Sequence, residues 1–239
     1  MYKYIKKHNM EVTMRSDLTL KERVMADIKQ SGVLPCIKLH HKTEDWITYA
    51  EAMYAGGARA VEITMTTPGA LEAIETISAH FKGKLHVAAG TVLDASTARE
   101  VIMHGGELIV NPCVIEDVIK LTNHYQVPVF SGAFTATECF TAMNLGATAI
   151  KIFPGAVGGA KYMTNLRMVF PEINLVPSGG ITEENVADFI RAGACAVSGA
   201  RTFMNFDMIN KEGFGWITKQ VAKFVQLIAE AKKDLPDIP

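Results

Sequence analysis

One pattern recurs eight times along the chain: a short apolar run rich in β-branched residues, a loop with glycine or proline, and a segment with helical periodicity. The spacing between successive runs, about 20–28 residues, is typical of parallel strands joined by helices through short loops. Eight such strands close into a (β/α)8 barrel, the TIM barrel, because closure leaves no unpaired sheet edge. The runs that we predict as strands are Val33–Leu39, Ala60–Met65, Leu85–Ala89, Leu108–Val110, Val127–Phe130, Ala149–Phe153, Ile173–Pro177 and Ala196–Ser198.

The segments between the runs carry the start signals of helices. Thr43, Asp94 and Thr182 each precede one, where a side-chain oxygen accepts a hydrogen bond from a free backbone N–H. An extra helix over Leu18–Ser31 is expected to close the N-terminal end of the barrel. The other predicted helices are Glu44–Ala55, Ala70–Phe81, Ser96–His104, Glu116–His124, Thr137–Leu145, Tyr162–Val169, Glu183–Ala192 and Phe214–Lys233.

An open doubly wound sheet is the alternative architecture. Such a sheet normally has a glycine-rich turn after its first strand, and here the chain reads His40-His41-Lys42-Thr43. The length of 239 residues also lies within the range of one α/β barrel. We therefore predict a flexible N-terminal arm over residues 1–17 and a single barrel domain over residues 18–239.

Composition and charge argue against several classes of binding partner. A net charge of −1 gives no field that would attract nucleic acid or an acidic membrane, so neither is expected to bind. The chain contains no run of 18 apolar residues that would suggest a membrane span. Four separate cysteines without metal-binding spacing predict reduced thiols in a cytoplasmic protein, with no metal ion and no cofactor. They are Cys36, Cys113, Cys139 and Cys195.

Lys151 is the most unusual residue in the predicted strands. It stands between Ile150 and Ile152 in a strand that must be apolar on both faces, and lysine is almost never fully buried without a partner. Burial disfavours the charged form of an amine, and a neutral amine can attack a carbonyl and form a Schiff base. The alternative is that the amine reaches the barrel mouth or simply pairs with Glu62.

Glu62 is the acidic residue that matches it. With the period of two of a strand, Glu62, Thr64 and Thr66 share one face, and the residues between them are apolar. This polar face suits the interior and mouth of the barrel. A carboxylate beside a neutral amine in a dry site is a general acid or base for carbinolamine formation and C–C cleavage. A salt bridge to Lys151 without catalysis is the alternative.

Glycine turns follow the last two strands. Ser178-Gly179-Gly180 places backbone N–H groups at a strand-to-helix turn, where aligned amides attract phosphate or carboxylate. In barrels of this type the loops after strands seven and eight form the usual phosphate site, and Ser198-Gly199-Ala200-Arg201 supplies the second half. Arg201 can add a bidentate charged contact, although a surface arginine without such a role is the alternative.

Several motifs in this order and spacing resemble the 2-keto-3-deoxy-6-phosphogluconate (KDPG) and 4-hydroxy-2-oxoglutarate (KHG) aldolase family. The resemblance covers roughly Leu18 to Phe203. It implies a metal-independent class I aldolase on a (β/α)8 barrel, commonly a homotrimer, whose partners are a keto-deoxy sugar acid and its product pyruvate. The motifs are Gly57-Ala58-Arg59-Ala60-Val61-Glu62-Ile63-Thr64, Ala89-Gly90-Thr91-Val92, Val110-Asn111-Pro112, Lys151-Ile152-Phe153-Pro154-Gly155 and Pro177-Ser178-Gly179-Gly180-Ile181.

The resemblance also implies roles for individual residues. Lys151 is expected to form the Schiff base and Glu62 to shuttle protons. The second product is an aldehyde, glyceraldehyde 3-phosphate or glyoxylate. The substrate-binding residues that the resemblance implies are Thr91 at the pyruvate carboxylate, Pro112 and Phe153 around the enamine, and Ser178, Gly179, Gly180 and Gly199 at the distal phosphate.

The chain differs from the family pattern at residues expected to contact the two ends of the substrate. Many members carry arginine where this chain has Thr66, and others have threonine there with a basic residue at the end of strand one, the place of Lys38. We therefore assign Lys38 as the cation for the substrate carboxylate, beside Thr66. At strand eight a small Gly-Ser pair is replaced by Ala200 and Arg201.

Two other functions remain open on the sequence alone. A phosphate-binding barrel isomerase or epimerase would keep the glycine turns and use Glu62 as a simple base, with no covalent intermediate. A barrel that binds a sugar acid as a sensor would retain the pocket without turnover. Retention of activity after Lys151→Arg would favour the former, and pyruvate binding without cleavage the latter.

Overall fold

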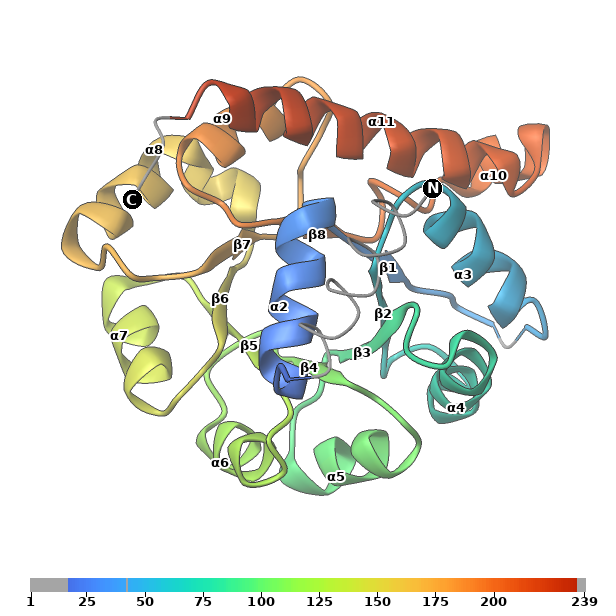
Figure 1. The fold of residues 1–239 in the computed structure, drawn as a ribbon, viewed down its shortest axis with the longest axis horizontal. Helices are drawn as coiled ribbons and strands as arrows, with labels where there is room; N and C mark the ends of the chain where they lie inside the picture. The colour runs from blue at the N-terminus through green and yellow to red at the C-terminus, as the bar shows by residue number, and fades with distance from the viewer. Residues whose placement is uncertain (1–16, 42, 236–239) are drawn as a thin grey trace, which may run out of the picture.

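Eight parallel strands form the centre of the structure, a computed structural model that describes residues 17–41 and 43–235. They hydrogen-bond in the order β7-β6-β5-β4-β3-β2-β1-β8, and bridges from Leu175 to Ala194 and from Ser178 to Ser198 bring β7 beside β8. The predicted TIM barrel is confirmed (Figure 1). The strands are β1 (Val33–Ile37), β2 (Ala60–Thr64), β3 (His86–Gly90), β4 (Leu108–Val110), β5 (Val129–Ala133), β6 (Ala149–Ile152), β7 (Leu175–Pro177) and β8 (Val197–Gly199).

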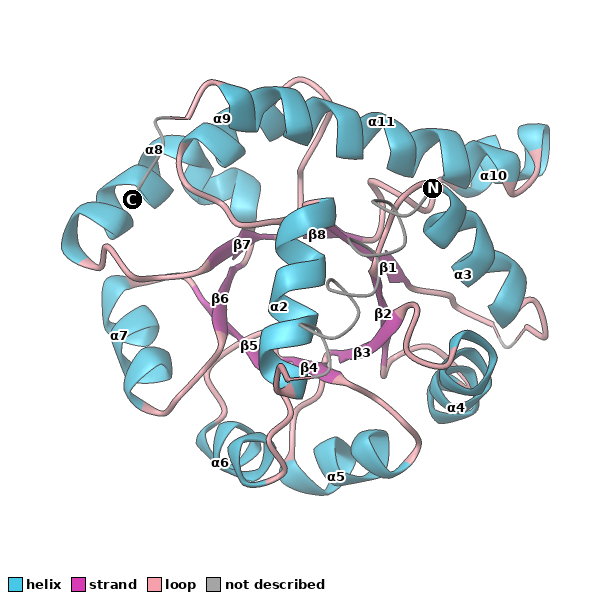
Figure 2. Cartoon of the chain, in the orientation of Figure 1, coloured by secondary structure: helices cyan, strands magenta, loops and turns pink. Residues whose placement is uncertain are grey.

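A ring of helices surrounds the strands (Figure 2). All the predicted helices are present, and the bounds of α4 and α6 agree with the prediction residue for residue. The ring consists of α3 (Trp46–Ala55), α4 (Ala70–Phe81), α5 (Ala95–Met103), α6 (Glu116–His124), α7 (Ala136–Asn144), α8 (Gly155–Val169), α9 (Val186–Arg191), α10 (Phe206–Glu212) and α11 (Gly215–Lys233).

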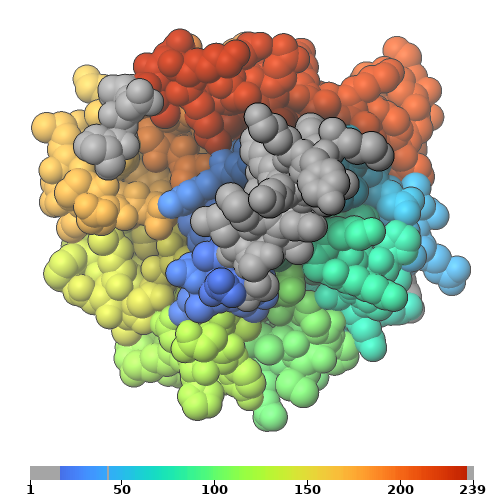
Figure 3. Space-filling view, in the orientation of Figure 1, coloured from blue at the N-terminus to red at the C-terminus, as the bar shows by residue number. Residues whose placement is uncertain are grey.

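The extra helix α2 (Leu20–Ser31) lies across the N-terminal opening of the barrel (Figures 1 and 3). It begins with a capping box, in which the side chains of Thr19 and Glu22 satisfy each other's backbone N–H groups. Its apolar face packs into the barrel, so the predicted closing helix is confirmed. The residues of this interior cluster are Val24, Met25 and Ile28 of α2 together with Leu34, Ala60, Ala88, Leu108, Val110, Phe130, Ala149, Val176 and Ala196.

Alternation along the strands separates this interior cluster from a second, outer core. Val61 and Ile63 of β2 pack outward against the helices, whereas Ala60 points inward, so Glu62 and Thr64 also face the interior. The same alternation puts Lys151 inside the barrel, because its neighbours Ile150 and Ile152 belong to the outer core. The barrel therefore carries apolar side chains near α2 and polar ones toward the opposite, C-terminal opening.

Some predicted boundaries were wrong. Thr43 and Thr182 are not helix caps, because α3 begins after Asp45 and α9 after Asn185. Helix α8 starts at Gly155, seven residues before the predicted start at Tyr162, and is interrupted at Gly159, whose φ of 69° and ψ of 175° are not helical. The sequence reading also missed α10, a short helix capped by the side chain of Asn205.

Two other expectations concern the N-terminal arm and membrane-spanning segments. The predicted flexible arm lies outside the described residues, apart from Asp17. Of the helices in the described ranges, none combines the length and apolar character that a membrane span requires.

Candidate active site

Lys151 and Glu62 meet inside the barrel near its C-terminal opening. Lys151 projects from β6 and Glu62 from β2, and the distance from Nζ of Lys151 to Oε1 of Glu62 is 3.6 Å. Both residues are buried, with 9% of Lys151 and 1% of Glu62 exposed. The two side chains that stand out in the sequence therefore lie next to each other, and their catalytic roles stay a prediction. An amine and a carboxylate at this distance in a dry site can divide nucleophilic attack and proton transfer between them.

Two further side chains contact the Glu62 carboxylate. The hydroxyl of Ser198 on β8 donates to Oε2 at 3.3 Å, and the thiol of Cys36 on β1 lies 3.7 Å from Oε1. Burial, together with the negative charge of Glu62, raises the pKa of the Cys36 thiol well above its usual value, against the opposing charges of Lys151 and Lys38. The thiol is therefore protonated at neutral pH and donates to the carboxylate.

Three of the predicted substrate-binding residues lie at this end of the barrel. The ring centroid of Phe153 lies 5.8 Å from Nζ of Lys151. Thr91 follows the end of β3 and adopts a positive φ of 58°, which is uncommon for a residue with a side chain. Pro112 approaches the backbone of Gly132, the register partner of Lys151, so closely that a side-chain carbon at Gly132 would lie 2.1 Å from the Pro112 carbonyl carbon. The structure thus brings Thr91, Pro112 and Phe153 to the same end of the barrel as the reactive pair.

Lys38 and Thr66, which are predicted to bind the substrate carboxylate, lie at the rim of the barrel. Both residues are exposed, and Lys38 directly follows β1. The hydroxyl of Thr66 donates to that of Thr64, which pairs with Thr67 at 3.0 Å, and Thr67 accepts the backbone N–H of Leu39. This chain of hydroxyls joins the ends of β1 and β2. Binding of the substrate carboxylate by Lys38 and Thr66 stays a prediction.

The turn after β7 lies against Phe153 and the end of β8. Ser178 is buried and bridges to Ser198, and a side-chain carbon at Gly179 would lie 3.2 Å from the ring of Phe153. Gly179 and Gly180 have φ angles of 84° and 74°, a conformation that favours glycine. The carbonyls of Ser178 and Gly179 accept N–H groups from the start of α8, so this turn is fastened to that helix.

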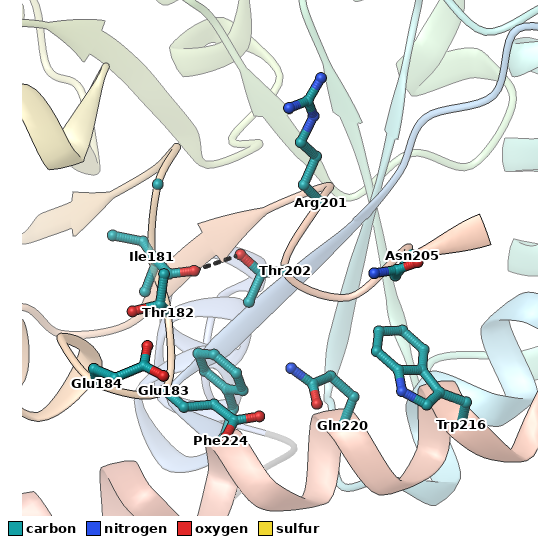
Figure 4. Close-up of a pocket in the computed structure, with 11 residues that line it drawn as sticks. Ile181, Thr182, Glu183, Glu184, Arg201, Thr202, Asn205, Trp216, Gln220 and Phe224 are labelled. Atoms are coloured by element: carbon teal, nitrogen blue, oxygen red, sulfur yellow. Dashed lines mark hydrogen bonds between the residues drawn. The ribbon is translucent and has the colours of Figure 1, made fainter. Parts of the chain in front are cut away.

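A cavity of about 490 Å³ lies beyond this turn, between the loops after β7 and β8 and helix α11 (Figure 4). Gly180 and Arg201 both line it, whereas Lys151 and Glu62 do not. The side chain of Arg201 points away from Gln220 and Trp216, and Thr202 fastens the two loops by donating to the carbonyl of Ile181 at 2.9 Å. Gly199 is buried at the end of β8 beside Thr202, and the Ala200 carbonyl accepts the N–H groups of Phe203 and Met204.

The sequence pattern places Ser198 only in the phosphate-end segment Ser198-Gly199-Ala200-Arg201 and gives Cys36 no role in the site. In the structure Cys36 is the register partner of Glu62, and Ser198 is that of Leu34, whose side chain belongs to the interior cluster. The alternation Leu34, Cys36 on β1 is the signal that could have placed the thiol inside the barrel. In the described part of the chain, histidine, cysteine and carboxylate side chains do not gather in groups of three that could hold a metal ion.

Comparison with known proteins gives a consistent set of relatives. A family model described as KDPG and KHG aldolase matches residues 24–220. The 2-dehydro-3-deoxy-6-phosphogalactonate aldolase of Escherichia coli K12 is 36% identical over 157 residues, which cover 65% of this chain and 76% of the relative. The KHG/KDPG aldolase of the same organism is 29% identical over 195 residues, covering 81% of this chain and 91% of the relative.

Solved structures are also similar to this chain. One of them is the KDPG aldolase from Legionella pneumophila with pyruvate captured at low pH as a covalent carbinolamine intermediate. It matches with a TM-score of 0.76 and 26% identity, covering 83% of this chain and 96% of that chain.

Proposed function

Because the chain belongs to the KDPG and KHG aldolase family, a family of class I aldolases, we propose that it uses Lys151 as the Schiff-base amine and Glu62 as the proton-transfer group. The proposed substrate is KDPG or a related 2-keto-3-deoxy or 4-hydroxy-2-oxo acid, cleaved to pyruvate and an aldehyde, glyceraldehyde 3-phosphate or glyoxylate. The observation that carries this proposal is the 3.6 Å approach of Lys151 Nζ to Glu62 Oε1 in a buried site at the C-terminal barrel opening.

The geometry supports the following sequence of steps. The amine of Lys151 attacks the C2 ketone and forms a carbinolamine, which loses water to give an iminium ion. Glu62 accepts the proton of the C4 hydroxyl, directly or through water, while the C3–C4 bond breaks and its electron pair flows to the iminium nitrogen. An aldehyde leaves and an enamine remains. The enamine is protonated at C3 by Glu62, and water hydrolyses the resulting iminium to release pyruvate and restore the free amine.

The covalent step has a direct test. Borohydride added to the protein with pyruvate is expected to attach one reduced three-carbon unit, and peptide mass spectrometry should place it on Lys151. Lys151→Ala is expected to lose both the adduct and the cleavage activity, whereas Lys161→Ala, on α8, retains both. If the wild-type protein cleaves its substrate without forming the adduct, the proposed mechanism is wrong.

The identity of the substrate needs a second experiment. The relatives named above include enzymes for the phosphogalactonate and the phosphogluconate series, which differ in configuration at C4. We propose that the loops after β7 and β8 decide between them and between phosphorylated and free acids. A panel of keto-deoxy acids of both configurations, each with and without the 6-phosphate, assayed for released pyruvate, will rank these substrates by kcat/KM.

We also propose that the chain assembles as a homotrimer, as its resemblance to the family implied. Supporting this, Phe140 of α7 and Met168 and Val169 of α8 are exposed large apolar side chains, and the Phe140 ring stacks on that of Phe170 at 6.0 Å. Exposed apolar patches of this kind mark interaction surfaces. Light scattering after size exclusion should give the mass of three chains, and Phe140→Asp should reduce it. A wild-type mass of one chain would contradict the proposal.

A further inference from the structure

We propose that Ser198 and Cys36 are positioning residues that hold the Glu62 carboxylate in place for proton transfer beside Lys151. The proposal rests on the function proposed above and concerns how the same site works. Neither residue belongs to the motifs that identify the family resemblance, and both are buried inside the barrel, with 2% of Ser198 and 5% of Cys36 exposed.

The contacts come from neighbouring strands on one side of Glu62. Strand β1 lies between β2 and β8, so Cys36 stands next to Glu62 and Ser198 stands one strand further on. Ser198 contacts Oε2, whereas Cys36 and Lys151 contact Oε1. The two carboxylate oxygens therefore have different partners, and a rotation of the carboxylate about its Cγ–Cδ bond would break the contacts of both.

Both hydrogen-bond donors to the Glu62 carboxylate are uncharged. The pKa of the Cys36 thiol is raised, first by burial and then by the charge of Glu62, so the thiol keeps its proton. A serine hydroxyl is neutral at every pH of interest. Hydrogen bonds from neutral donors orient the Glu62 carboxylate without placing another charge beside it. On the opposite side Gly90 of β3 carries no side chain, and Ser198 and Cys36 contact the carboxylate from the β1 side.

This arrangement predicts that loss of the two contacts affects proton transfer but not imine formation. Formation of the imine requires the Lys151 amine, whereas removal of a proton from C3 of bound pyruvate and cleavage of the C3–C4 bond require a correctly aimed Glu62. Loss of the positioning contacts should therefore slow proton transfer and leave trapping of pyruvate intact. A general loss of structure would instead reduce both together.

The experiment compares these two readouts in the full-length protein. Ser198→Ala removes the hydroxyl, and Cys36→Val removes the thiol donor while keeping most of its volume. For each variant, exchange of pyruvate methyl protons with deuterium oxide is followed by NMR, and the borohydride adduct is quantified by mass spectrometry. We expect each substitution to slow exchange and kcat by about threefold to tenfold, with adduct yield and KM nearly unchanged.

Matched controls exclude a packing effect. Ser131 and Cys139 are equally buried, but Ser131 is the register partner of the outward-facing Ile150 and Cys139 belongs to the outer core. Ser131→Ala and Cys139→Val should leave exchange unchanged. Ser198→Cys and Cys36→Ser keep a donor and should restore most of the rate, and Cys36→Ala serves where the valine variant does not fold.

The outcomes separate the two proposals. A wild-type protein that traps no pyruvate contradicts the proposed function itself. A wild-type protein that traps pyruvate, combined with Ser198→Ala and Cys36→Val variants that exchange protons at the wild-type rate, overturns the positioning role alone. Equal losses of exchange and trapping in these variants also overturn it.

Discussion

Gly90 and Glu62 face each other across adjacent strands so closely that a methyl group on Gly90 would lie 1.9 Å from Oε1 of Glu62. Gly90 ends β3 and is the register partner of Thr64, so its α-carbon borders the space that the Glu62 side chain occupies. The φ of Gly90 is not in the left-handed region, and a glycine is therefore required here for space and not for backbone conformation. The position of the carboxylate beside Lys151 depends on that space.

The substitution Gly90→Ala should consequently push the carboxylate away from Lys151. We expect kcat/KM for pyruvate release to fall by about 100-fold, the cost of a displacement of about 1 Å in a catalytic group. Gly215→Ala is the matched control, because a side-chain carbon there meets no atom within 4 Å. Steady-state kinetics of the three proteins will test this expectation, and near-wild-type activity in Gly90→Ala would show that Glu62 does not need its observed position.

The replacement Glu62→Gln keeps the shape of the side chain and removes its ability to accept a proton. Loss of a general base typically costs about 10²–10⁴-fold in rate, and we expect cleavage to fall within that range. Borohydride should still trap pyruvate on Lys151, although more slowly if Glu62 also assists carbinolamine dehydration. Glu116→Gln, in an exposed pair with Lys120 on α6, is the control. Full cleavage activity in the Glu62→Gln protein would remove Glu62 from the mechanism.

The sequence predicted the barrel because its signals are local. Short β-branched runs and capped helices follow from residues near in the chain, as the matching bounds of α4 (Ala70–Phe81) illustrate. Lys151 and Glu62 were also predictable, since a charged residue in an apolar strand is conspicuous in one dimension. The helix α10 (Phe206–Glu212) was missed because a run of seven residues carries little periodicity.

The contacts of Cys36, Ser198 and Gly90 with Glu62 do not follow from local sequence signals. They depend on the register between strands that lie up to 136 residues apart, as Ser198 and Glu62 do. Serine, cysteine and glycine are also ordinary residues in a buried strand, so composition gives no warning of their role. Pairwise register has to be known before such neighbours can be identified, and the order of the strands alone does not supply it.

His86 provides a pH-dependent contact at the other end of the barrel. Its ring is buried and lies 2.6 Å from Glu107 and 3.0 Å from Asp27 of α2. Burial disfavours the charged ring, but the hydrogen bonds and charges of Glu107 and Asp27 outweigh it, and the pKa of His86 is raised above its usual value. The charged ring thereby fastens α2 to the barrel.

A raised pKa in the folded state makes this contribution to stability fully present below about pH 6.5, the usual pKa of histidine. It is lost as the pH rises through the folded-state value. Urea unfolding should show that His86→Gln lowers the free energy of unfolding by about 1.5–3 kcal/mol at pH 6 and by less at pH 9. His104→Gln, at the half-buried C-cap of α5, is the control substitution. A difference that is independent of pH would contradict the assignment of charge to His86.

Arg201 offers a test of whether the distal end of the site binds phosphate. It lines the same cavity as Gly180 of the glycine turn, so we expect a phosphate bound there to contact both. We expect Arg201→Ala to raise KM for the 6-phosphorylated acid by about tenfold, the value of one hydrogen bond to a charged group. The KM for the unphosphorylated acid should stay constant, because that substrate carries no charge at this end. Arg99→Ala, at an exposed position on α5, controls for the loss of one surface charge. Equal changes for both substrates would mean that Arg201 acts on the loop and not on the phosphate, whereas no change for either would place the distal group away from the loop after β8.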